Sequence, residues 1–252
     1  MPRIARVFRA ALAAAVLVAL ACAAWAGELY QIGTIEALTA GDYAGRDTFA
    51  ALARHGDFGL GTFTDLDGEM VALDGRFYQV RTDGVAYPVP PSRRTPFAQV
   101  VFFKGSLDLG RVDGLDLAGL GAALAARLPD PTRFYAVRLD GLFATVKTRS
   151  VPAQQKPWPP LATAVAAQSV FPMERTAGTM VGIYTPPGAS SLSPTGWHFH
   201  FLTADRKRGG HVLAATVAVA KARGEQVTDL RLVFPAGPTP RLDGPPPAAG
   251  TE

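Results

Sequence analysis

Short apolar segments separated by Asp-Gly turns constrain the fold of this chain more than any other feature. Asp67-Gly68, Asp74-Gly75 and Asp83-Gly84 follow one another closely, and apolar or aromatic residues flank each pair. An Asp-Gly pair favours a tight hairpin turn, because both residues tolerate the positive φ that such a turn requires. This region therefore predicts an antiparallel meander, with strands over 58–63, 69–73, 77–80 and 85–89.

The rest of the chain is also typical of strands, with a few short helices. Further strands are expected over 29–38, 97–103, 179–184, 196–203 and 229–234. Residues 134–139 and 142–149 predict another hairpin, with its turn at Asp140-Gly141. Helices are expected over 48–53, 115–128 and 161–169, the first capped by Asp47 or Thr48. Residues 211–220 are ambiguous, because their alanines favour a helix and their valines favour a strand.

Composition places the chain among folded globular proteins. Of its 252 residues 48% are hydrophobic and 18% charged, which excludes a disordered or fibrous protein. A Pro-rich connector over 152–160 suggests a boundary between two lobes. We therefore expect a mostly β chain with a few helices, divided into an N-terminal lobe over 27–151 and a C-terminal β lobe over 152–235. Residues 236–252 are expected to form a Pro-rich tail.

The first 26 residues are typical of a secretory signal peptide. Arg3, Arg6 and Arg9 precede an uncharged apolar run over 10–24, and Ala24-Trp25-Ala26 offers small residues for cleavage after Ala26. A membrane anchor is the alternative, but the run is shorter than the roughly 20 residues of a spanning helix. We therefore expect an exported protein, periplasmic or secreted. Cleavage would remove Cys22, the single cysteine, and with it any disulfide or thiolate ligand.

The net charge of +4 does not indicate a nucleic-acid-binding protein. Three of the 25 basic residues lie in the predicted signal peptide, and no acidic residue precedes Glu28. Beyond residue 26 the basic and acidic residues nearly balance, which leaves no electrostatic reason to expect nucleic acid or an anionic membrane as a partner.

The histidines point to a metal site. The chain has four, and His198, His200 and His211 lie within fourteen residues. Residues i and i+2 of a strand project to one face, so His198 and His200 project together. If the chain turns back around Asp205-Arg206, His200 lies opposite His211, and three imidazoles converge as in a catalytic zinc site. The alternative is a set of partly buried histidines bonded to backbone. His55 follows a predicted helix, where a C-terminal capping role is favoured.

Several motifs together resemble the α-acetolactate decarboxylase family. They are HGDFGLGTF (55–63), LDGEM (66–70), LDGRFY (73–78), PFAQVV (96–101), Thr148-Arg149, GWHFHF (196–201) and GGHVL (209–213). The resemblance spans about residues 28–235. It implies a zinc-type ion on His198, His200 and His211, active-site roles for Glu69 and Arg149, and a place for Thr62 in the lining of the same pocket. It also implies an α+β fold, with an N-terminal mixed β-sheet lobe and a smaller, mainly antiparallel C-terminal β lobe that carries the histidines. The family forms a homodimer in which the N-terminal mixed sheet joins that of a partner, and the resemblance implies the same here.

The resemblance implies decarboxylation of 2-acetolactate to acetoin and CO2, within the acetoin and butanediol pathway. Zn²⁺, or another divalent transition metal, would act as a Lewis acid on the hydroxyl and ketone oxygens, so that no organic cofactor is needed. Arg149 has the planar, two-pronged donor that suits the substrate carboxylate. Glu69 is the candidate acid that protonates the product.

Two other function classes stay open at this point. One is a different exported metalloenzyme with the same three histidines, such as an oxygenase. The other is a non-catalytic metal-binding module, which would need no carboxylate-binding arginine. The sequence also departs from the family near its C-terminus, where the family brings an acidic residue to the active site. Only Asp243 and Glu252 are acidic beyond Phe234, and neither lies in a matching motif.

Overall fold

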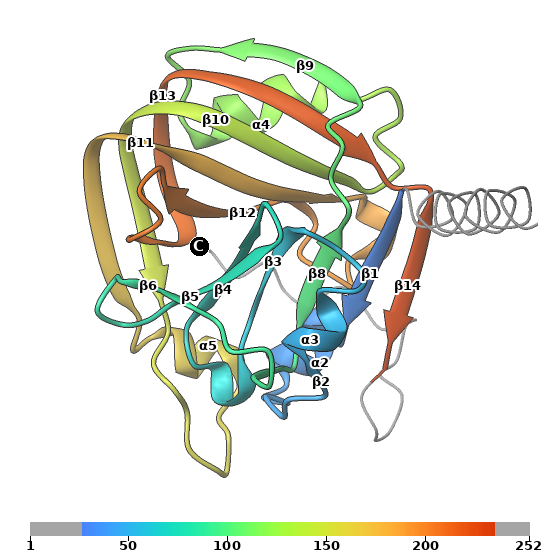
Figure 1. The fold of residues 1–252 in the computed structure, drawn as a ribbon, viewed down its shortest axis with the longest axis vertical. Coiled ribbons are helices and arrows are strands. Elements are labelled where there is room, and N and C mark those ends of the chain that lie inside the picture. The colour runs from blue at the N-terminus through green and yellow to red at the C-terminus, as the bar shows by residue number, and fades with distance from the viewer. Residues whose placement is uncertain (1–26, 235–252) are drawn as a thin grey trace, which may run out of the picture.

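Two β-sheets packed against each other make up most of the molecule (Figure 1). The structure is a computed structural model that describes residues 27–234. The predicted signal peptide and the predicted Pro-rich tail lie outside the described residues. Strands dominate and helices are few and short, which confirms the expected α+β class. No helix within residues 27–234 has the length and apolar character needed to cross a membrane.

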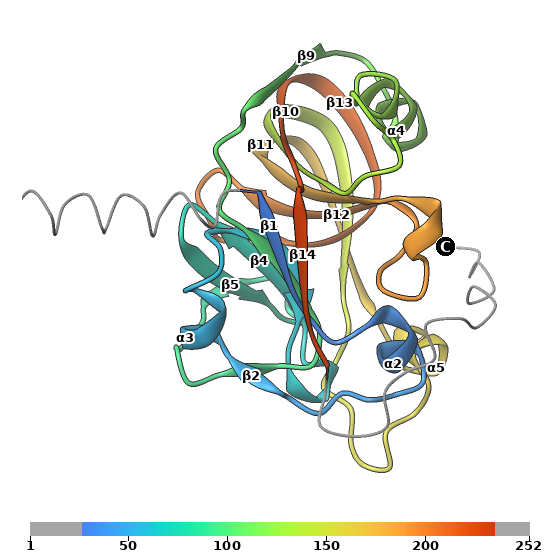
Figure 2. The same cartoon turned by 90° about the vertical axis from the view of Figure 1, so that its right-hand side faces the viewer.

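The first sheet is mixed and contains seven strands in the order β14-β1-β8-β3-β4-β5-β6. The strands are β1 (Glu28–Ile32), β3 (Phe58–Thr62), β4 (Glu69–Leu73), β5 (Arg76–Val80), β6 (Ala86–Pro88), β8 (Ala98–Val101) and β14 (Asp229–Val233). Only β1 and β14 pair in parallel, and they lie side by side although they come from opposite ends of the described chain (Figure 2). Two short strands, β2 (Asp47–Thr48) and β7 (Arg94–Thr95), form a separate pair.

The second sheet is antiparallel and contains five strands in the order β10-β11-β12-β13-β9. Its strands are β9 (Leu107–Val112), β10 (Tyr135–Ser150), β11 (Ser169–Thr185), β12 (Gly196–Thr203) and β13 (Gly209–Gln226). Because β10 also pairs with β13, this sheet closes on itself. The chain enters it after β8 and leaves it before β14. Residue 152, the predicted lobe boundary, falls between two strands of this one sheet, and the division into lobes stays a prediction.

The predicted meander is confirmed, and its turns have the expected conformation. Strands β3, β4 and β5 pair in sequence order, with Thr62 opposite Glu69 and Leu73 opposite Arg76. Asp74 and Gly75 connect the last two with φ angles of 54° and 73°. Both angles are positive, as a two-residue hairpin turn requires. The meander thereby places Thr62, the last residue of β3, beside Glu69, the first residue of β4.

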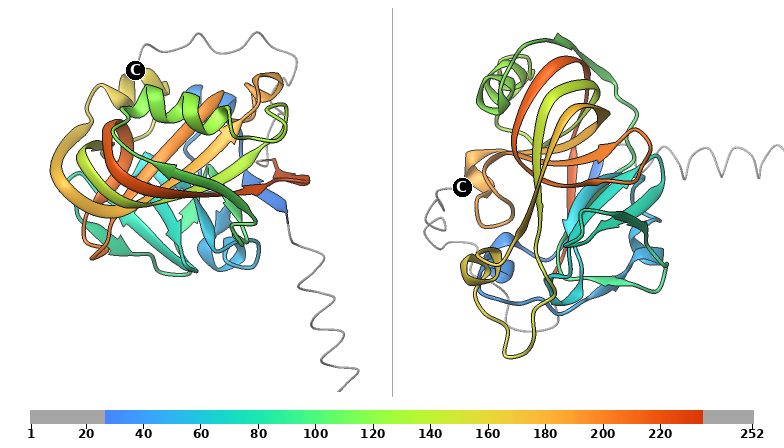
Figure 3. Two further views of the ribbon diagram at one scale, coloured as in Figure 1. Left: turned by 90° about the horizontal axis from the view of Figure 1, so that it is seen from above. Right: turned by 90° about the vertical axis from the view of Figure 1, so that its left-hand side faces the viewer.

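The helices cover the sheets and the connections between them. They are α2 (Ile35–Thr39), α3 (Phe49–Leu52), α4 (Leu117–Ala125) and α5 (Leu161–Val165), with 3-10 turns at Thr64–Leu66 and Pro187–Ala189. The Thr48 side chain caps α3 by accepting from the amide of Ala51, which confirms the predicted cap. Figure 3 shows α4 against the second sheet, where its buried Leu120 and Leu124 join a cluster that contains Phe199 and Phe201.

Two strand predictions were wrong. The strand expected over 29–38 ends at Ile32, because Gly33 has a φ of 67° and the Thr34 side chain caps α2. The hairpin expected at Asp140-Gly141 does not form, and β10 runs unbroken through both residues. A Cβ at residue 141 would lie 2.2 Å from the Val219 carbonyl oxygen, so this glycine serves close strand approach rather than a turn. The ambiguous segment 211–220 is part of β13, and β9 was not anticipated.

The two sheets share an apolar core, and the site described next lies at its border. Leu60 and Val71 of the first sheet pack with Val181, Ile183 and Leu202 of the second. The β-strand register places His198 opposite Ile183 and His200 opposite Val181. Since cross-strand partners share a face, both histidines face the first sheet at the border of this core.

Candidate metal centre

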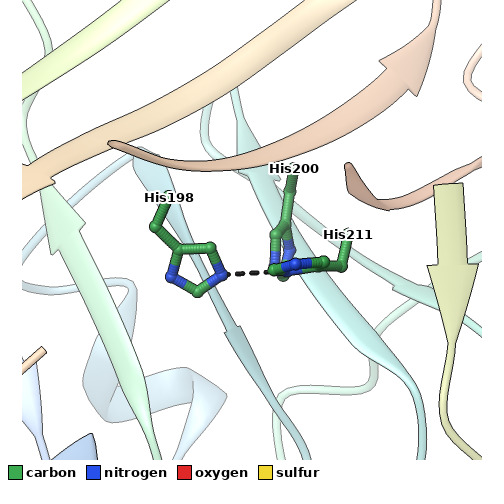
Figure 4. Close-up of side chains that lie close together, drawn as sticks. All are labelled: His198, His200 and His211. Atoms are coloured by element: carbon green, nitrogen blue, oxygen red, sulfur yellow. Dashed lines mark hydrogen bonds between the residues drawn. The ribbon is translucent and has the colours of Figure 1, made fainter. Parts of the chain in front are cut away.

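Three imidazoles meet between the sheets, as the sequence predicted (Figure 4). One ligand nitrogen of each of His198, His200 and His211 lies within 4.8 Å of the other two. His198 Nε2 is 3.0 Å from His211 Nδ1, which in turn is 3.4 Å from His200 Nε2. The pairing of β12 with β13 is responsible, because it sets His200 directly opposite His211.

The turn between these two strands fixes that pairing. Thr203 donates through its hydroxyl to the Asp205 carboxylate at 2.6 Å and accepts from the amide of Arg208 at 3.0 Å. Two glycines follow, and each allows a close backbone approach. A Cβ at Gly209 would lie 2.2 Å from the Phe201 carbonyl oxygen, and one at Gly210 would lie 2.4 Å from the Arg149 carbonyl oxygen. The Gly-Gly-His sequence therefore brings His211 close to both neighbouring strands.

A backbone carbonyl of the first sheet orients His200. The ring nitrogen Nδ1 of His200 lies 2.8 Å from the Met70 carbonyl oxygen, which can only accept a hydrogen bond. Nδ1 therefore carries the proton, and the lone pair of Nε2 points at the other two histidines. This is the arrangement by which an outer hydrogen bond sets the tautomer of a metal-ligating histidine.

Burial keeps all three imidazoles neutral. It lowers the pKa of His200 to about 3, and the nearby Arg149 charge adds to this effect, against the Met70 hydrogen bond. Burial likewise lowers the pKa of His198 and of His211 far below the usual range, with further lowering from Arg149 and the neighbouring rings. Neutral imidazole is the form that binds a metal ion, so the site is ready for one at neutral pH.

Glu69 and Thr62 reach the site from the first sheet. The Glu69 carboxylate is buried, and its Oε2 lies 3.6 Å from Nε2 of His200. Thr62 is its cross-strand partner and is also buried. The Thr62 hydroxyl donates to the Gly68 carbonyl oxygen at 2.7 Å, which ties this residue to the turn that leads into β4. Thr62 thus lies beside Glu69, one strand further from the histidines.

Arg149 reaches the site from the second sheet. It lies directly opposite His211 in the pairing of β10 with β13. Its Nη1 donates to the Gln168 side-chain oxygen at 3.2 Å. Neither Gln168 nor the Met70 carbonyl group could be predicted from the sequence, since neither stands in a recognisable spacing with the histidines. Their contacts follow only from the packing of the two sheets and from the position of α5.

His55, the fourth histidine, lies elsewhere. Its ring stacks on Tyr30 with the ring centroids 3.8 Å apart, and its Nδ1 lies 3.7 Å from the Glu28 carboxylate. Its backbone amide donates to the Leu52 carbonyl oxygen at the end of α3. His55 therefore lies outside the cluster of three histidines, and it is a suitable control position for substitutions in that cluster.

The donor set suits a divalent transition metal. Three converging neutral imidazoles leave one or more coordination positions for other ligands, as in catalytic zinc sites. Imidazole also accepts Co²⁺, Ni²⁺ or Fe²⁺, so the residues alone do not select one ion. The buried Glu69 carboxylate beside the cluster could take part in binding or in proton transfer.

Comparison with known proteins gives a consistent result. The sequence model of the alpha-acetolactate decarboxylase family matches residues 29–239. An alpha-acetolactate decarboxylase of Methanosarcina mazei is 45% identical over 206 residues, which cover 82% of this chain and 70% of that protein. One from Bacillus licheniformis is 37% identical over 208 residues, covering 82% of each.

Solved structures agree with the sequence comparisons. The crystal structure of alpha-acetolactate decarboxylase from Bacillus subtilis strain 168 superposes with a TM-score of 0.82 at 35% identity. The match covers 86% of this chain and 94% of that one. A Staphylococcus aureus protein of unknown function, similar to alpha-acetolactate decarboxylase, superposes with a TM-score of 0.80 at 29% identity.

Replacing one ligand should release the metal. We expect His200→Ala to bind a divalent transition metal at least about 100-fold more weakly than the wild type, because two imidazoles hold an ion far less tightly than three. The metal content of the purified protein, measured by mass spectrometry after dialysis, checks this. His55→Gln is the matched control and should keep its metal. Full metal occupancy in His200→Ala would show that this residue is not a ligand.

Proposed function

The chain belongs to the alpha-acetolactate decarboxylase family, and we propose that it works through a divalent transition-metal ion on His198, His200 and His211. Family membership establishes the reaction class: the protein is a carboxy-lyase that decarboxylates acetolactate. The product of that reaction is acetoin, which links the enzyme to acetoin and butanediol metabolism. The convergence of the three imidazoles is the observation that supports a metal.

The ion, Zn²⁺ or a similar metal, would supply Lewis-acid stabilisation to the hydroxyl and ketone oxygens of the substrate. The protein side of this arrangement is a set of neutral, prealigned imidazoles. His200 is held by the Met70 carbonyl oxygen, and burial keeps all three rings unprotonated. Together with membership of the family, these prealigned imidazoles favour a metal-dependent decarboxylase over an oxygenase-like enzyme and over a non-catalytic metal-binding module.

Arg149 is proposed to bind the substrate carboxylate. A guanidinium donates two parallel hydrogen bonds to a carboxylate, which fixes the orientation of the group that will leave as CO2. Arg149 stands opposite His211, so the bound carboxylate would lie next to the histidines. Gln168 accepts from Nη1 of Arg149 and thereby restricts the rotation of the guanidinium. Arg149 and Gln168 together would therefore align the carbon–carbon bond that breaks when CO2 leaves.

Glu69 is proposed to deliver the proton that replaces CO2 on the substrate. Its carboxylate is buried and lies 3.6 Å from His200 Nε2, which places it at the wall of the site contributed by the first sheet. A proton delivered from one side only would give a single enantiomer of acetoin. Thr62, beside Glu69, is proposed to line the substrate pocket from the same side.

We also propose that the mature protein is a homodimer built on the first sheet. β14 is an edge strand that pairs only with β1 within residues 27–234, and Leu230 on it is 37% exposed. The other edge, β6, is three residues long and ends at Pro88, which cannot donate a ladder hydrogen bond. β14 is therefore the edge of the first sheet that a second copy of this chain can extend. A monomer mass in sedimentation equilibrium would contradict this.

Export is proposed on the sequence alone. The basic leader, the apolar run and the Ala24-Trp25-Ala26 site support cleavage after Ala26 and a periplasmic or secreted product. Protein recovered outside the cytoplasm should begin at Gly27, and an uncleaved N-terminus there would contradict the assignment.

Removing Arg149 should separate metal binding from turnover. We expect Arg149→Ala to keep one metal ion per chain and to lose at least 100-fold in kcat/KM, because the carboxylate loses its two-pronged partner. Arg149→Lys should recover only part of the activity, since an ammonium cannot bind in the same planar manner.

Arg93 offers a matched control. Its guanidinium pairs with Asp67 on the turn before β4 and lies over the Phe63 ring. Within residues 27–234, the hydrogen bonds of the three histidine rings go to one another and to the Met70 carbonyl oxygen. Arg93→Ala should therefore change kcat/KM little. Wild-type kcat/KM in Arg149→Ala would refute the assigned role of Arg149.

A further inference from the structure

The residue that follows Arg149 carries a fully buried hydroxyl group. Ser150 is the last residue of β10, and none of its surface is exposed. Its hydroxyl donates to the carbonyl oxygen of Val80, the last residue of β5, at 2.9 Å. This bond crosses from the second sheet to the first, where the end of β10 lies beside β5 (Figure 1). Val80 is the cross-strand partner of Glu69, so the bond joins the neighbour of Arg149 to the neighbour of Glu69.

A main-chain hydrogen bond joins the two sheets at the same place. The amide of Gly68, the residue before Glu69, donates to the carbonyl oxygen of Val151 at 3.0 Å. Gly68 has a φ of 86°, and a Cβ built on it would lie 2.3 Å from the Val80 carbonyl oxygen. Because residue 68 has no side chain, the end of β10 can reach Gly68 and Val80 together.

The hydroxyl on the other side of Arg149 serves the histidines instead. Thr148 is also fully buried, and its hydroxyl donates to the Gly209 carbonyl oxygen at 2.8 Å. Gly209 lies two residues before His211. Arg149 therefore stands between two anchored residues: Thr148 ties β10 to the histidine hairpin, and Ser150 ties it to the strands that carry Glu69.

The Ser150 hydroxyl contributes direction more than stability. The net gain from a buried hydrogen bond between neutral groups is small, because the same groups bond to water in the unfolded chain. A hydrogen bond does, however, restrict both the distance and the angle between its two groups. The bond from Ser150 to Val80 thus fixes how β10 sits on β5, and through β5 how it sits on β4.

We propose that Ser150 is a positioning residue, which sets the placement of the Arg149 guanidinium relative to the Glu69 carboxyl group. The proposal rests on the roles proposed above for these two residues. When the carboxylate held by Arg149 leaves as CO2, the electron pair of the broken carbon–carbon bond stays with the substrate and takes a proton from Glu69. The relative placement of the two side chains then decides which face of the substrate receives that proton.

Removing the hydroxyl should affect turnover and product chirality but not the metal. We expect Ser150→Ala to lower kcat about 10-fold, because small misplacements of reacting groups are costly. KM should change less than about 2-fold, since Arg149 still binds the carboxylate. The enantiomeric excess of the acetoin should fall, and the zinc content should stay at the wild-type value. A loss of folded protein would lower the rate but would leave both KM and the enantiomeric excess unchanged.

The experiment uses the zinc-loaded protein with acetolactate, and chiral gas chromatography of the acetoin formed early in the reaction. Thr34→Ala is the matched control, because it removes another buried hydroxyl, the one that caps α2. It should lower the resistance to urea and leave the enantiomeric excess at the wild-type value. Ser150→Cys keeps the size of the side chain and a weak donor, so its enantiomeric excess should lie between those of wild type and Ser150→Ala. It takes the place of Ser150→Ala should that variant fail to fold.

Two results would overturn the positioning role of Ser150. One is a Ser150→Ala variant with wild-type kcat and wild-type enantiomeric excess. The other is an equal fall in enantiomeric excess in Thr34→Ala, because the effect would then follow stability and not position. The wild type alone tests the premises: racemic acetoin from it would overturn one-sided proton delivery and this proposal with it, and no acetoin at all would overturn the proposed function.

Discussion

The antiparallel pairing of β12 with β13 is the constraint on which the site depends. It sets His200 opposite His211 and leaves His198 two residues away on the same face. A shift of one residue in this register would turn one of the two strands' side chains to the opposite face and separate the imidazoles. The Thr203–Arg208 turn and the close approaches at Gly209 and Gly210 prevent that shift. These local contacts therefore bring the three imidazoles together as well as stabilising the fold.

The second requirement is that the two sheets pack face to face. The shared apolar core brings β4 against β12, so that the Met70 carbonyl oxygen reaches His200 and the Glu69 carboxylate lies beside it. One sheet thereby contributes the three imidazoles and Arg149, and the other contributes Glu69 and the carbonyl group that orients His200. The same burial that packs the sheets keeps the imidazoles neutral, so core formation and metal binding favour the same protonation state.

The sequence predicted the parts of the site that follow local rules. The spacing of His198 and His200, with His211 beyond a turn, follows from the alternation of side chains along a strand, and the meander follows from its Asp-Gly turns. The positions of Glu69, Arg149 and Thr62 could be assigned only through the family resemblance, because pairing between distant strands leaves no local pattern. The turn predicted at Asp140-Gly141 was wrong for the same reason. Gly141 allows the close approach of a neighbouring strand, which the local sequence does not reveal. Gln168 contacts Arg149 through the tertiary arrangement alone.

Acetoin formation from racemic acetolactate by the mature protein, before and after chelation and again after zinc is restored, tests the metal-dependent mechanism most directly. We expect chelation to abolish turnover and zinc to restore it, because the three neutral imidazoles are the fixed element around which Arg149 and Glu69 are placed. Undiminished acetoin formation in protein shown to be free of metal would contradict the mechanism, and the histidine cluster would then need a different role.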